Sequence, residues 1–198
     1  MQISWFGYSA FRIQSEGTTL ITDPVDQASK FKINKQGANI VVASHEDGDP
    51  GNAVSGTPFI ISGPGEYEAQ SVFVQGVTVN GATVYVMTIE GISIAYVGAL
   101  KVRELTGEQL SALEGADILI VPVGGGPVCS AKEAVQIINQ VEPRIVIPSY
   151  YRIAQSKGLD AVQVFLKEYA APSEETDKFK IRKKDLPQED TKVIIIKQ

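Results

Sequence analysis

One histidine and three carboxylates follow an apolar segment without interruption. Residues 40–50 read Ile-Val-Val-Ala-Ser-His-Glu-Asp-Gly-Asp-Pro, and His45 is the only histidine of the chain. Glu46, Asp47 and Asp49 supply the carboxylates. Imidazole and carboxylate groups hold divalent metal ions and transfer protons in hydrolytic reactions. This segment is therefore the first candidate for a chemical site.

The apolar segment itself has the composition of a buried strand. Residues 40–43 are mostly β-branched, and Gly48 and Pro50 favour a loop after them. Ligands of α/β proteins collect beyond the carboxyl ends of the strands, where loops converge on a rigid sheet. We therefore expect a strand here that presents His45 and the carboxylates at the rim of a sheet.

Short β-prone segments dominate the rest of the sequence, and helical periodicity is confined to the second half. We predict strands at residues 3–6, 10–14, 19–22, 71–75, 77–79, 82–89, 92–97, 116–121, 144–147, 179–181 and 192–196. We predict helices at residues 105–113, 131–141 and 159–169. Residues 25–37 are expected to be irregular, and residues 172–177 are expected to form a linker. This mixture indicates the α/β class.

Two halves of the sequence echo each other. Residues 16–17 and 37–39 read Glu-Gly and Gly-Ala-Asn, and residues 90–91 and 115–117 read Glu-Gly and Gly-Ala-Asp. The similarity is short and rests largely on glycines. Each half predicts a hairpin followed by a buried strand, and stacking two such units would bury both sheets. We therefore expect residues 1–198 to form a single domain.

The composition limits the partners and the compartment. The chain has 198 residues, 43 % hydrophobic and 21 % charged, which is ordinary for a soluble globular protein. Its net charge of −5 argues against nucleic-acid and anionic-membrane partners. The basic residues 178–184 are interpreted as the solvated face of a strand.

The single cysteine, Cys129, fits a reducing cytoplasm, and no segment has the ~20 apolar residues that span a bilayer. Residues 1–6 show neither a basic n-region nor a long apolar h-region, so we expect no signal peptide here. We expect a cytoplasmic protein that binds a small molecule or another protein, with no nucleic acid and no membrane. The apolar residues 193–196 would allow pairing at a sheet edge or with a second subunit, and thus a homo-oligomer.

The order of several short motifs resembles the metallo-β-lactamase superfamily. The motifs are Trp5-Phe6-Gly7-Tyr8-Ser9, Thr22-Asp23-Pro24, Ser44-His45-Glu46-Asp47-Gly48-Asp49, Gly63-Pro64-Gly65-Glu66-Tyr67-Glu68, Val97-Gly98-Ala99, Ser130-Ala131-Lys132-Glu133-Ala134 and Ile147-Pro148-Ser149-Tyr150-Tyr151. More narrowly, the chain is similar to the small bacterial Zn-dependent hydrolases of that fold, which are related to lactonase-like enzymes. The resemblance implies a four-layer αββα sandwich in which the loops after residues 44, 97, 122 and 147 meet on one rim.

The same resemblance shows which metal ligands are missing. The family's metal loop, His-x-His-x-Asp-His, falls here on His45, Asp47, Asp49 and Pro50, so two histidines are absent. Only His45, Asp47 and Asp49 could still hold a metal, and they would hold a single ion at most.

Three further ligand positions of the family are also replaced. The histidine of the first loop falls on Tyr8, the bridging aspartate on Ala99 and the late histidine on Tyr150. Alanine offers no donor atom, and a neutral tyrosine with an ordinary pKa of about 10 is a poor ligand. The family's two-zinc site therefore cannot be assembled, and we expect Tyr8 and Tyr150 to fill the emptied pocket near His45.

Two functions remain open. The first is a non-catalytic pseudoenzyme that serves as a binding or assembly module, with an ancestral pocket at Tyr8, His45, Asp47, Asp49, Ala99 and Tyr150. The second is a divergent mononuclear metal-dependent hydrolase that acts on a small ester, lactone or phosphodiester. The number of lost ligands favours the first. No cofactor is expected, beyond at most one weakly bound divalent metal ion.

Overall fold

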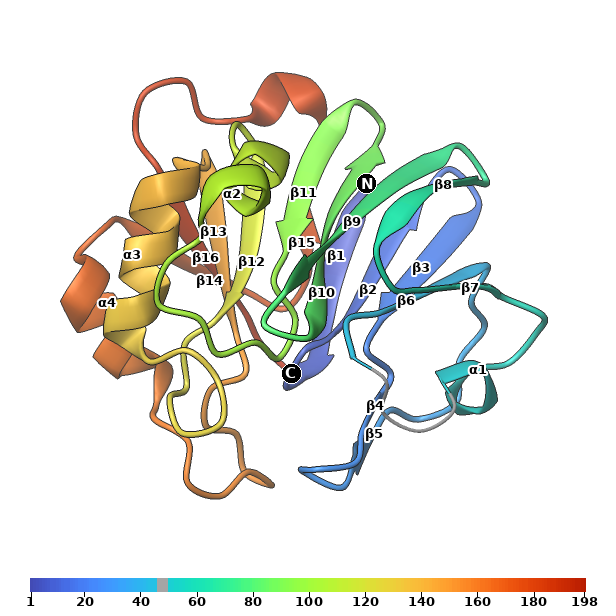
Figure 1. The fold of residues 1–198 in the computed structure, drawn as a ribbon, viewed down its shortest axis with the longest axis horizontal. Coiled ribbons are helices and arrows are strands. Elements are labelled where there is room, and N and C mark those ends of the chain that lie inside the picture. Colours follow the sequence, from blue (N-terminus) through green and yellow to red (C-terminus); the bar gives the residue numbers. More distant parts are fainter. Residues whose placement is uncertain (46–49) are drawn as a thin grey trace.

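The fold consists of two facing β-sheets with helices outside them (Figure 1). The computed structural model describes residues 1–45 and 50–198. In these residues, one six-stranded sheet runs in the order β15 (Phe179–Lys180), β1 (Gln2–Gly7), β2 (Ala10–Ser15), β3 (Thr18–Thr22), β6 (Ile40–Ala43) and β7 (Phe59–Ser62). The predicted strand at residues 40–43 is therefore confirmed, and it lies one position from the sheet edge.

The second sheet is larger and carries the helices. In the described residues its eight strands run in the order β14 (Ser173–Thr176), β16 (Lys192–Ile196), β13 (Ile145–Ser149), β12 (Ile118–Pro122), β11 (Ile92–Tyr96), β10 (Ala82–Ile89), β9 (Val72–Val79) and β8 (Gly65–Ala69). Figure 1 shows helices α2 (Gly107–Leu113), α3 (Ala131–Val141) and α4 (Val162–Tyr169) beside it. No helix in the described residues is long and apolar enough to cross a membrane.

Apolar side chains of both sheets meet in one core. Phe11 and Ile13 of β2, and Tyr85 and Met87 of β10, are at most 1 % exposed. Alternate residues of a strand share a face, so each pair points from its own sheet into the common interior. Fully burying each large apolar side chain contributes roughly 1.5–3 kcal/mol, and this holds the two sheets together.

The outer face of the six-stranded sheet is also covered. Ile21 of β3 and Val41 of β6 pack there with Ile33 and with Val54, which follows the one-turn helix α1 (Pro50–Ala53). Strand β6 is consequently buried on both faces, which explains its continuous apolar sequence. The predicted αββα order is confirmed, with one outer layer reduced in the described residues to α1 and its flanking segments.

Helix α3 is fixed by its ends and by one face. Ser130 and Glu133 form a capping box: the Ser130 amide donates to Glu133 Oε2 at 2.8 Å, and the Glu133 amide donates to Ser130 Oγ at 3.3 Å. The predicted bounds of this helix, residues 131–141, are those observed. Helix α4 begins at Val162 instead of residue 159, because Leu159 packs against the tyrosine cluster described below.

The echo between the two halves has a structural counterpart. Strands β2 and β3 form a hairpin and β6 runs parallel to β3, while β10 and β11 form a hairpin and β12 runs parallel to β11. The Thr19 amide donates to Asn39 Oδ1 at 2.8 Å, and the Ser93 amide donates to Asp117 Oδ2 at 2.9 Å. Equivalent polar side chains therefore tie each parallel strand to its hairpin.

Several expectations about the polar segments were wrong. Residues 25–37 contain a short ribbon of β4 (Val25–Asp26) and β5 (Phe31–Lys32), and residues 173–176 pair with β16 instead of forming a linker. The basic segment 178–184 is the face of a strand only in part: Lys180 is exposed on β15, whereas Lys183 and Lys184 belong to the 3₁₀ turn Lys183–Asp185. There, Lys183 Nζ lies 2.8 Å from Asp117 Oδ2.

The last strand is not a sheet edge. Strand β16 lies between β13 and β14, and Val193 through Ile196 are at most 5 % exposed. Its isoleucines are therefore buried core residues, not a surface for a second subunit. The two predicted strands at 71–75 and 77–79 are one strand, β9, in which a Cβ on Gly76 would lie 2.8 Å from the Tyr85 ring.

Candidate functional site

Strand ends from the two sheets touch on one rim of the molecule. Ser44 follows β6 of the six-stranded sheet, and Gly98 lies just beyond β11 of the eight-stranded sheet. A Cβ on Gly98 would overlap Ser44 Oγ and lie 2.5 Å from Ser44 Cβ, and the φ of Gly98 is +67°. Only glycine satisfies both the close approach and the left-handed backbone without strain. The expected meeting of the loops after residues 44 and 97 is therefore observed.

A buried aspartate organises this rim. Asp23, 2 % exposed, accepts hydrogen bonds from the Ser44 amide at 2.7 Å, from Ser44 Oγ at 2.6 Å and from the Tyr96 hydroxyl. Burial, and then the adjacent Asp23 carboxylate, raise the pKa of Tyr96 well above its ordinary value. Tyr96 therefore stays protonated and donates. Three donors occupy the carboxylate, which the sequence marked only as part of a Thr-Asp-Pro motif.

His45 is attached to this network through its Nδ1 atom. His45 Nδ1 lies 3.0 Å from Ser44 Oγ and 3.7 Å from Asp23 Oδ2. Because the Ser44 hydroxyl donates to Asp23, its oxygen accepts from His45 when Nδ1 carries the proton. Ser44 is thus not a nucleophile activated by His45, since its proton points to the carboxylate. The arrangement orients the imidazole and leaves the hydroxyl buried.

Tyr8, Ala99 and Tyr150 come together in one apolar cluster, which also contains Val128 and Leu159. The rings of Tyr8 and Tyr150 are 5.0 Å apart and nearly perpendicular, at 79°. The Tyr150 amide donates to the Tyr8 carbonyl oxygen at 2.9 Å. Of the three positions that the resemblance assigns to metal ligands, Tyr8 and Tyr150 are therefore buried against each other, and Ala99 is partly buried beside them.

The Tyr150 hydroxyl has a specific acceptor. It donates to Asp26 Oδ2, and Asp26, 2 % exposed, also accepts from the Ser29 amide at 3.0 Å. Burial, followed by the Asp26 carboxylate, raises the pKa of Tyr150 far above its ordinary value. The phenol is therefore a committed donor at neutral pH and not a metal ligand.

Both tyrosines hold an unusual backbone. The φ angles of Tyr8 and Tyr150 are +50° and +51°. Bulky residues with positive φ are uncommon and cost about 1–2 kcal/mol, so the surrounding contacts must hold them. Such strained positions occur at active sites and ligand sites, but in this chain other non-glycine residues, among them Asn80 and Glu142, share the same backbone region.

The described residues do not fit a dinuclear zinc centre. Ala99 offers no donor, the Tyr150 hydroxyl is bonded to Asp26, and three protein donors already surround Asp23. Within residues 1–45 and 50–198, no three His, Cys, Asp or Glu side chains are grouped to hold a metal ion. The predicted ligands Asp47 and Asp49 lie outside the described residues.

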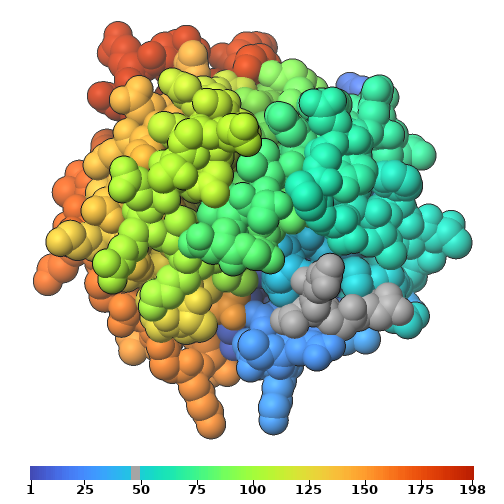
Figure 2. All heavy atoms as spheres, viewed as in Figure 1, coloured from blue at the N-terminus to red at the C-terminus, as the bar shows by residue number. Residues whose placement is uncertain are grey.

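A cavity of about 570 Å³ lies on another side of Tyr8. Strand β1, the β4–β5 ribbon with the loop after it, and the segment near residue 155 form its walls. Figure 2 shows a notch at this place, between a protruding blue segment and a protruding orange one. His45 and Asp23 are not among its lining residues. Sequence reasoning missed this cavity, because its residues come from distant segments.

The fold agrees with comparisons to known proteins. Residues 2–150 match the family model of the beta-lactamase superfamily domain. The chain belongs to the beta-lactamase superfamily. Within this superfamily, a UPF0173 protein of Pyrococcus furiosus is 25 % identical over 182 residues, covering 76 % of this chain and 83 % of its own. A UPF0173 protein of Pyrococcus abyssi is 27 % identical over 180 residues, with the same coverage.

Solved structures of the superfamily show the same fold. A protein from Thermotoga maritima, described as a candidate Zn-dependent hydrolase of the metallo-β-lactamase superfamily, superposes with a TM-score of 0.84 at 29 % identity, covering 99 % of both chains. Igni18, a metallo hydrolase from Ignicoccus hospitalis, superposes with a TM-score of 0.64 at 15 % identity, covering 85 % of this chain and 90 % of its own. This superfamily member therefore keeps the whole scaffold of the family.

Proposed function

We propose that this chain is a non-catalytic member of the beta-lactamase superfamily that acts as a binding or assembly module. The observation that carries the proposal is the Tyr150–Asp26 hydrogen bond beneath the packed Tyr8 ring. A hydrolytic site needs open coordination positions and an acidified water, whereas these groups are buried and bonded to each other.

The energetics of the cluster support the proposal. A buried polar network is stable only when its members are satisfied, and here each carboxylate has donors from both backbone and hydroxyl groups. Placing a metal at these positions would require breaking bonds that are each worth about 1.5–3 kcal/mol when a charged group is involved. This cost supports a site that holds no ion.

The alternative function, a mononuclear metal-dependent hydrolase, has one specific observation in its favour. Ser44 holds His45 Nδ1, and Asp23 holds Ser44. A hydrogen-bonded chain of this kind orients the imidazole of a metal ligand in many metalloproteins. In the mononuclear hydrolase, Asp47 and Asp49 would be the other two ligands of the metal ion.

Metal content and activity separate the two functions. Untagged protein, purified without chelator, is measured by elemental analysis and assayed for hydrolysis of a lactone, a phosphodiester and a β-lactam with added zinc and manganese. We expect well under one metal ion per chain and no metal-dependent turnover. His45→Ala should change the free energy of unfolding by less than about 1 kcal/mol.

The matched control is Asp23→Asn, which disturbs the same network without removing the imidazole. Stoichiometric metal that disappears in His45→Ala together with a measurable activity would contradict the proposal. That result would establish the mononuclear hydrolase.

A further inference from the structure

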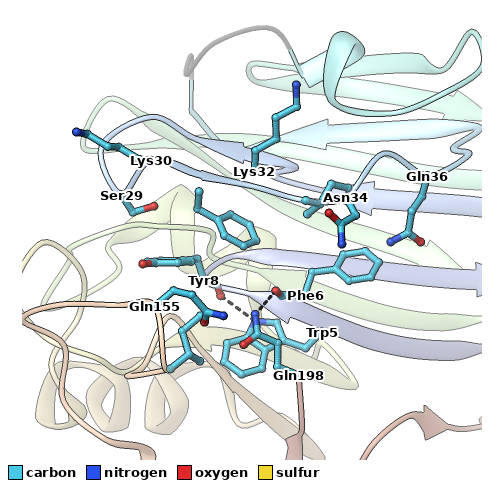
Figure 3. A pocket seen from close by; sticks show the side chains of 13 residues that line it. Trp5, Phe6, Tyr8, Ser29, Lys30, Lys32, Asn34, Gln36, Gln155 and Gln198 are labelled. Carbon is cyan, nitrogen blue, oxygen red and sulfur yellow. Dashed lines mark hydrogen bonds between the residues drawn. The ribbon is translucent and has the colours of Figure 1, made fainter.

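The cavity beside Tyr8 has walls of three chemical kinds. It is lined by aromatic rings, by side-chain amides and by lysines (Figure 3). Its volume of about 570 Å³ falls within the range of roughly 300–1,000 Å³ that is usual for small-molecule sites. The cavity shares Tyr8, Phe31 and Ile153 with the cluster at the rim, but Tyr150 and Ala99 do not line it. It is therefore a place for a ligand beside that cluster.

The aromatic wall would accept a planar ring. Phe6 and Phe31 line the cavity and are half-buried, and the ring of Phe31 lies 4.9 Å from that of Tyr8. Because Tyr8 is itself packed on Tyr150, the Phe31 side of this wall rests on a fixed support. Stacking of a flat heterocycle on such rings contributes about 1–3 kcal/mol for each base.

Side-chain amide groups of the cavity could form hydrogen bonds with the edge of a bound planar ring. Within the described residues, the side-chain amides of Asn34 and Gln155 make no hydrogen bond to protein, although both line the cavity. Each amide offers a donor and an acceptor side by side. That pairing matches the adjacent donor and acceptor atoms on the edge of a nucleobase. The Gln198 amide is already engaged, because its Nε2 donates to the Phe6 carbonyl oxygen at 2.6 Å.

The charged groups lie at the outer edge. Figure 3 shows Lys30 and Lys32 extending away from Tyr8, with their ammonium groups toward the outside. No acidic side chain is present among the described residues that line the cavity. In a chain with a net charge of −5, a cavity lining with two lysines and no acidic side chain among the described residues differs in sign from the chain as a whole. The neighbouring Asp26 carboxylate is buried and bonded to the Ser29 amide. The two lysines favour an anionic group at the mouth.

We propose that this cavity binds a nucleoside monophosphate, with the base against Phe6 and Phe31 and the phosphate near Lys30 and Lys32. The proposal gives a ligand to the binding module and rests on the proposed function to that extent. The same chemistry is present in a free nucleotide and at the end of a nucleic acid. The net charge of −5 opposes a polyanion, so the free nucleotide is the expected ligand.

The test is a titration of the full chain with AMP, GMP, CMP and UMP, followed by calorimetry. Trp5, the only tryptophan of the chain, lines the cavity, so its fluorescence gives a second, local readout. The matching nucleosides, inorganic phosphate and a tetranucleotide are titrated separately as comparison ligands. We expect saturable binding of at least one nucleotide, weaker binding of its nucleoside, and no advantage for the tetranucleotide.

Substitutions locate the site. The double variant Lys30→Gln/Lys32→Gln should weaken nucleotide binding about tenfold and leave nucleoside binding unchanged. Lys35→Gln is the matched control, since Lys35 belongs to the same segment but does not line the cavity. Phe31→Ala should weaken both ligands at least about fivefold, whereas Phe73→Ala, an exposed phenylalanine elsewhere, should not.

Each remaining outcome overturns the inference. Absence of saturable binding at millimolar nucleotide would refute it, and so would binding that Lys30→Gln/Lys32→Gln and Phe31→Ala leave unchanged. Tighter binding of the tetranucleotide would replace the free nucleotide by a nucleic-acid end. None of these results depends on metal content or hydrolysis, so a failure here is distinguishable from a failure of the proposed function.

Discussion

Tyr150→Phe removes one hydroxyl from the tyrosine cluster and keeps the ring. In the folded protein this hydroxyl donates to Asp26 Oδ2, and Asp26 is 2 % exposed. After the substitution, the carboxylate keeps the Ser29 amide on its other oxygen, at 3.0 Å. The buried Oδ2 atom then lacks the Tyr150 donor.

The expected cost follows from the charge of the acceptor. Hydrogen bonds to charged groups contribute about 1.5–3 kcal/mol, and a buried acceptor left without its donor carries a desolvation penalty of similar size. We therefore expect Tyr150→Phe to lower the free energy of unfolding by about 2 kcal/mol. For a chain of this length that corresponds to a decrease in Tm of roughly 4–8 °C.

The neighbouring residue provides a matched control. Tyr151 is also buried, but its hydroxyl lies 3.4 Å from its acceptor, the Ile196 carbonyl oxygen. Tyr151→Phe removes the same atom from the same kind of environment, yet breaks only a weak bond to a neutral group. We expect it to cost less than about 0.5 kcal/mol. Urea unfolding followed by circular dichroism measures both values.

A double-mutant cycle decides whether the bond to Asp26 causes the loss. In an Asp26→Ala background, Tyr150→Phe should cost less than about 0.5 kcal/mol, because its partner is gone. Equal costs for Tyr150→Phe and Tyr151→Phe, or a full cost of Tyr150→Phe in the Asp26→Ala background, would refute the assignment of a buried, charge-assisted hydrogen bond.

Two further predictions concern the same rim and its tyrosines. Gly124→Ala should lower the free energy of unfolding, measured in urea, by about 3 kcal/mol, because the new Cβ would overlap the Tyr150 carbonyl oxygen. The control Gly37→Ala should lower it by less than about 1 kcal/mol, because the atom nearest to its new Cβ is 3.9 Å away. Equal costs would contradict the close packing at Gly124. The free energy of unfolding should fall above pH ~10, because the tyrosines ionise there in the unfolded chain while they stay protonated in the folded one. The stability that the buried, protonated tyrosines contribute is therefore lost as the pH rises toward their raised folded pKa values. Burial raises the pKa of Tyr85 to about 12 and also raises those of Tyr8, Tyr96, Tyr150 and Tyr151. Unfolding midpoints measured between pH 8 and 11 test this, and a flat profile would refute it.

Local patterns in the sequence predicted many of the strands and helix α3. The apolar run at residues 40–43 predicted β6, and the Ser130 cap with its apolar stripe predicted the bounds of α3. Glycine and proline marked the turns between strands. These signals are local, since a strand buried on both faces, a helix cap or a turn is encoded within a few residues. The order of motifs then indicated the family and its fold.

The misassigned elements depend on distant partners. Strand β14 (Ser173–Thr176) has a polar sequence and is held by pairing with β16, so nothing in residues 173–176 alone predicts a strand. The apolar sequence of β16 allowed an edge position in the sheet. Its pairing with both β13 and β14 shows that it is an inner strand. Leu159 has a helical position in the periodicity, but packing against Tyr8 and Tyr150 removes it from α4.

The candidate site divides in the same way. The sequence, through its resemblance to the family, predicted that Tyr8, Ala99 and Tyr150 stand at the positions of two histidines and a bridging aspartate. It also predicted that they do not supply the same donor atoms, because donor atoms belong to the side chain and not to the fold. The tertiary structure decided what these residues do instead. It brings Asp26 beneath the Tyr150 hydroxyl across 124 residues of sequence, and Asp23 beneath Ser44 and Tyr96. Such partners are chosen by the packing of one sheet on the other, which no local pattern encodes.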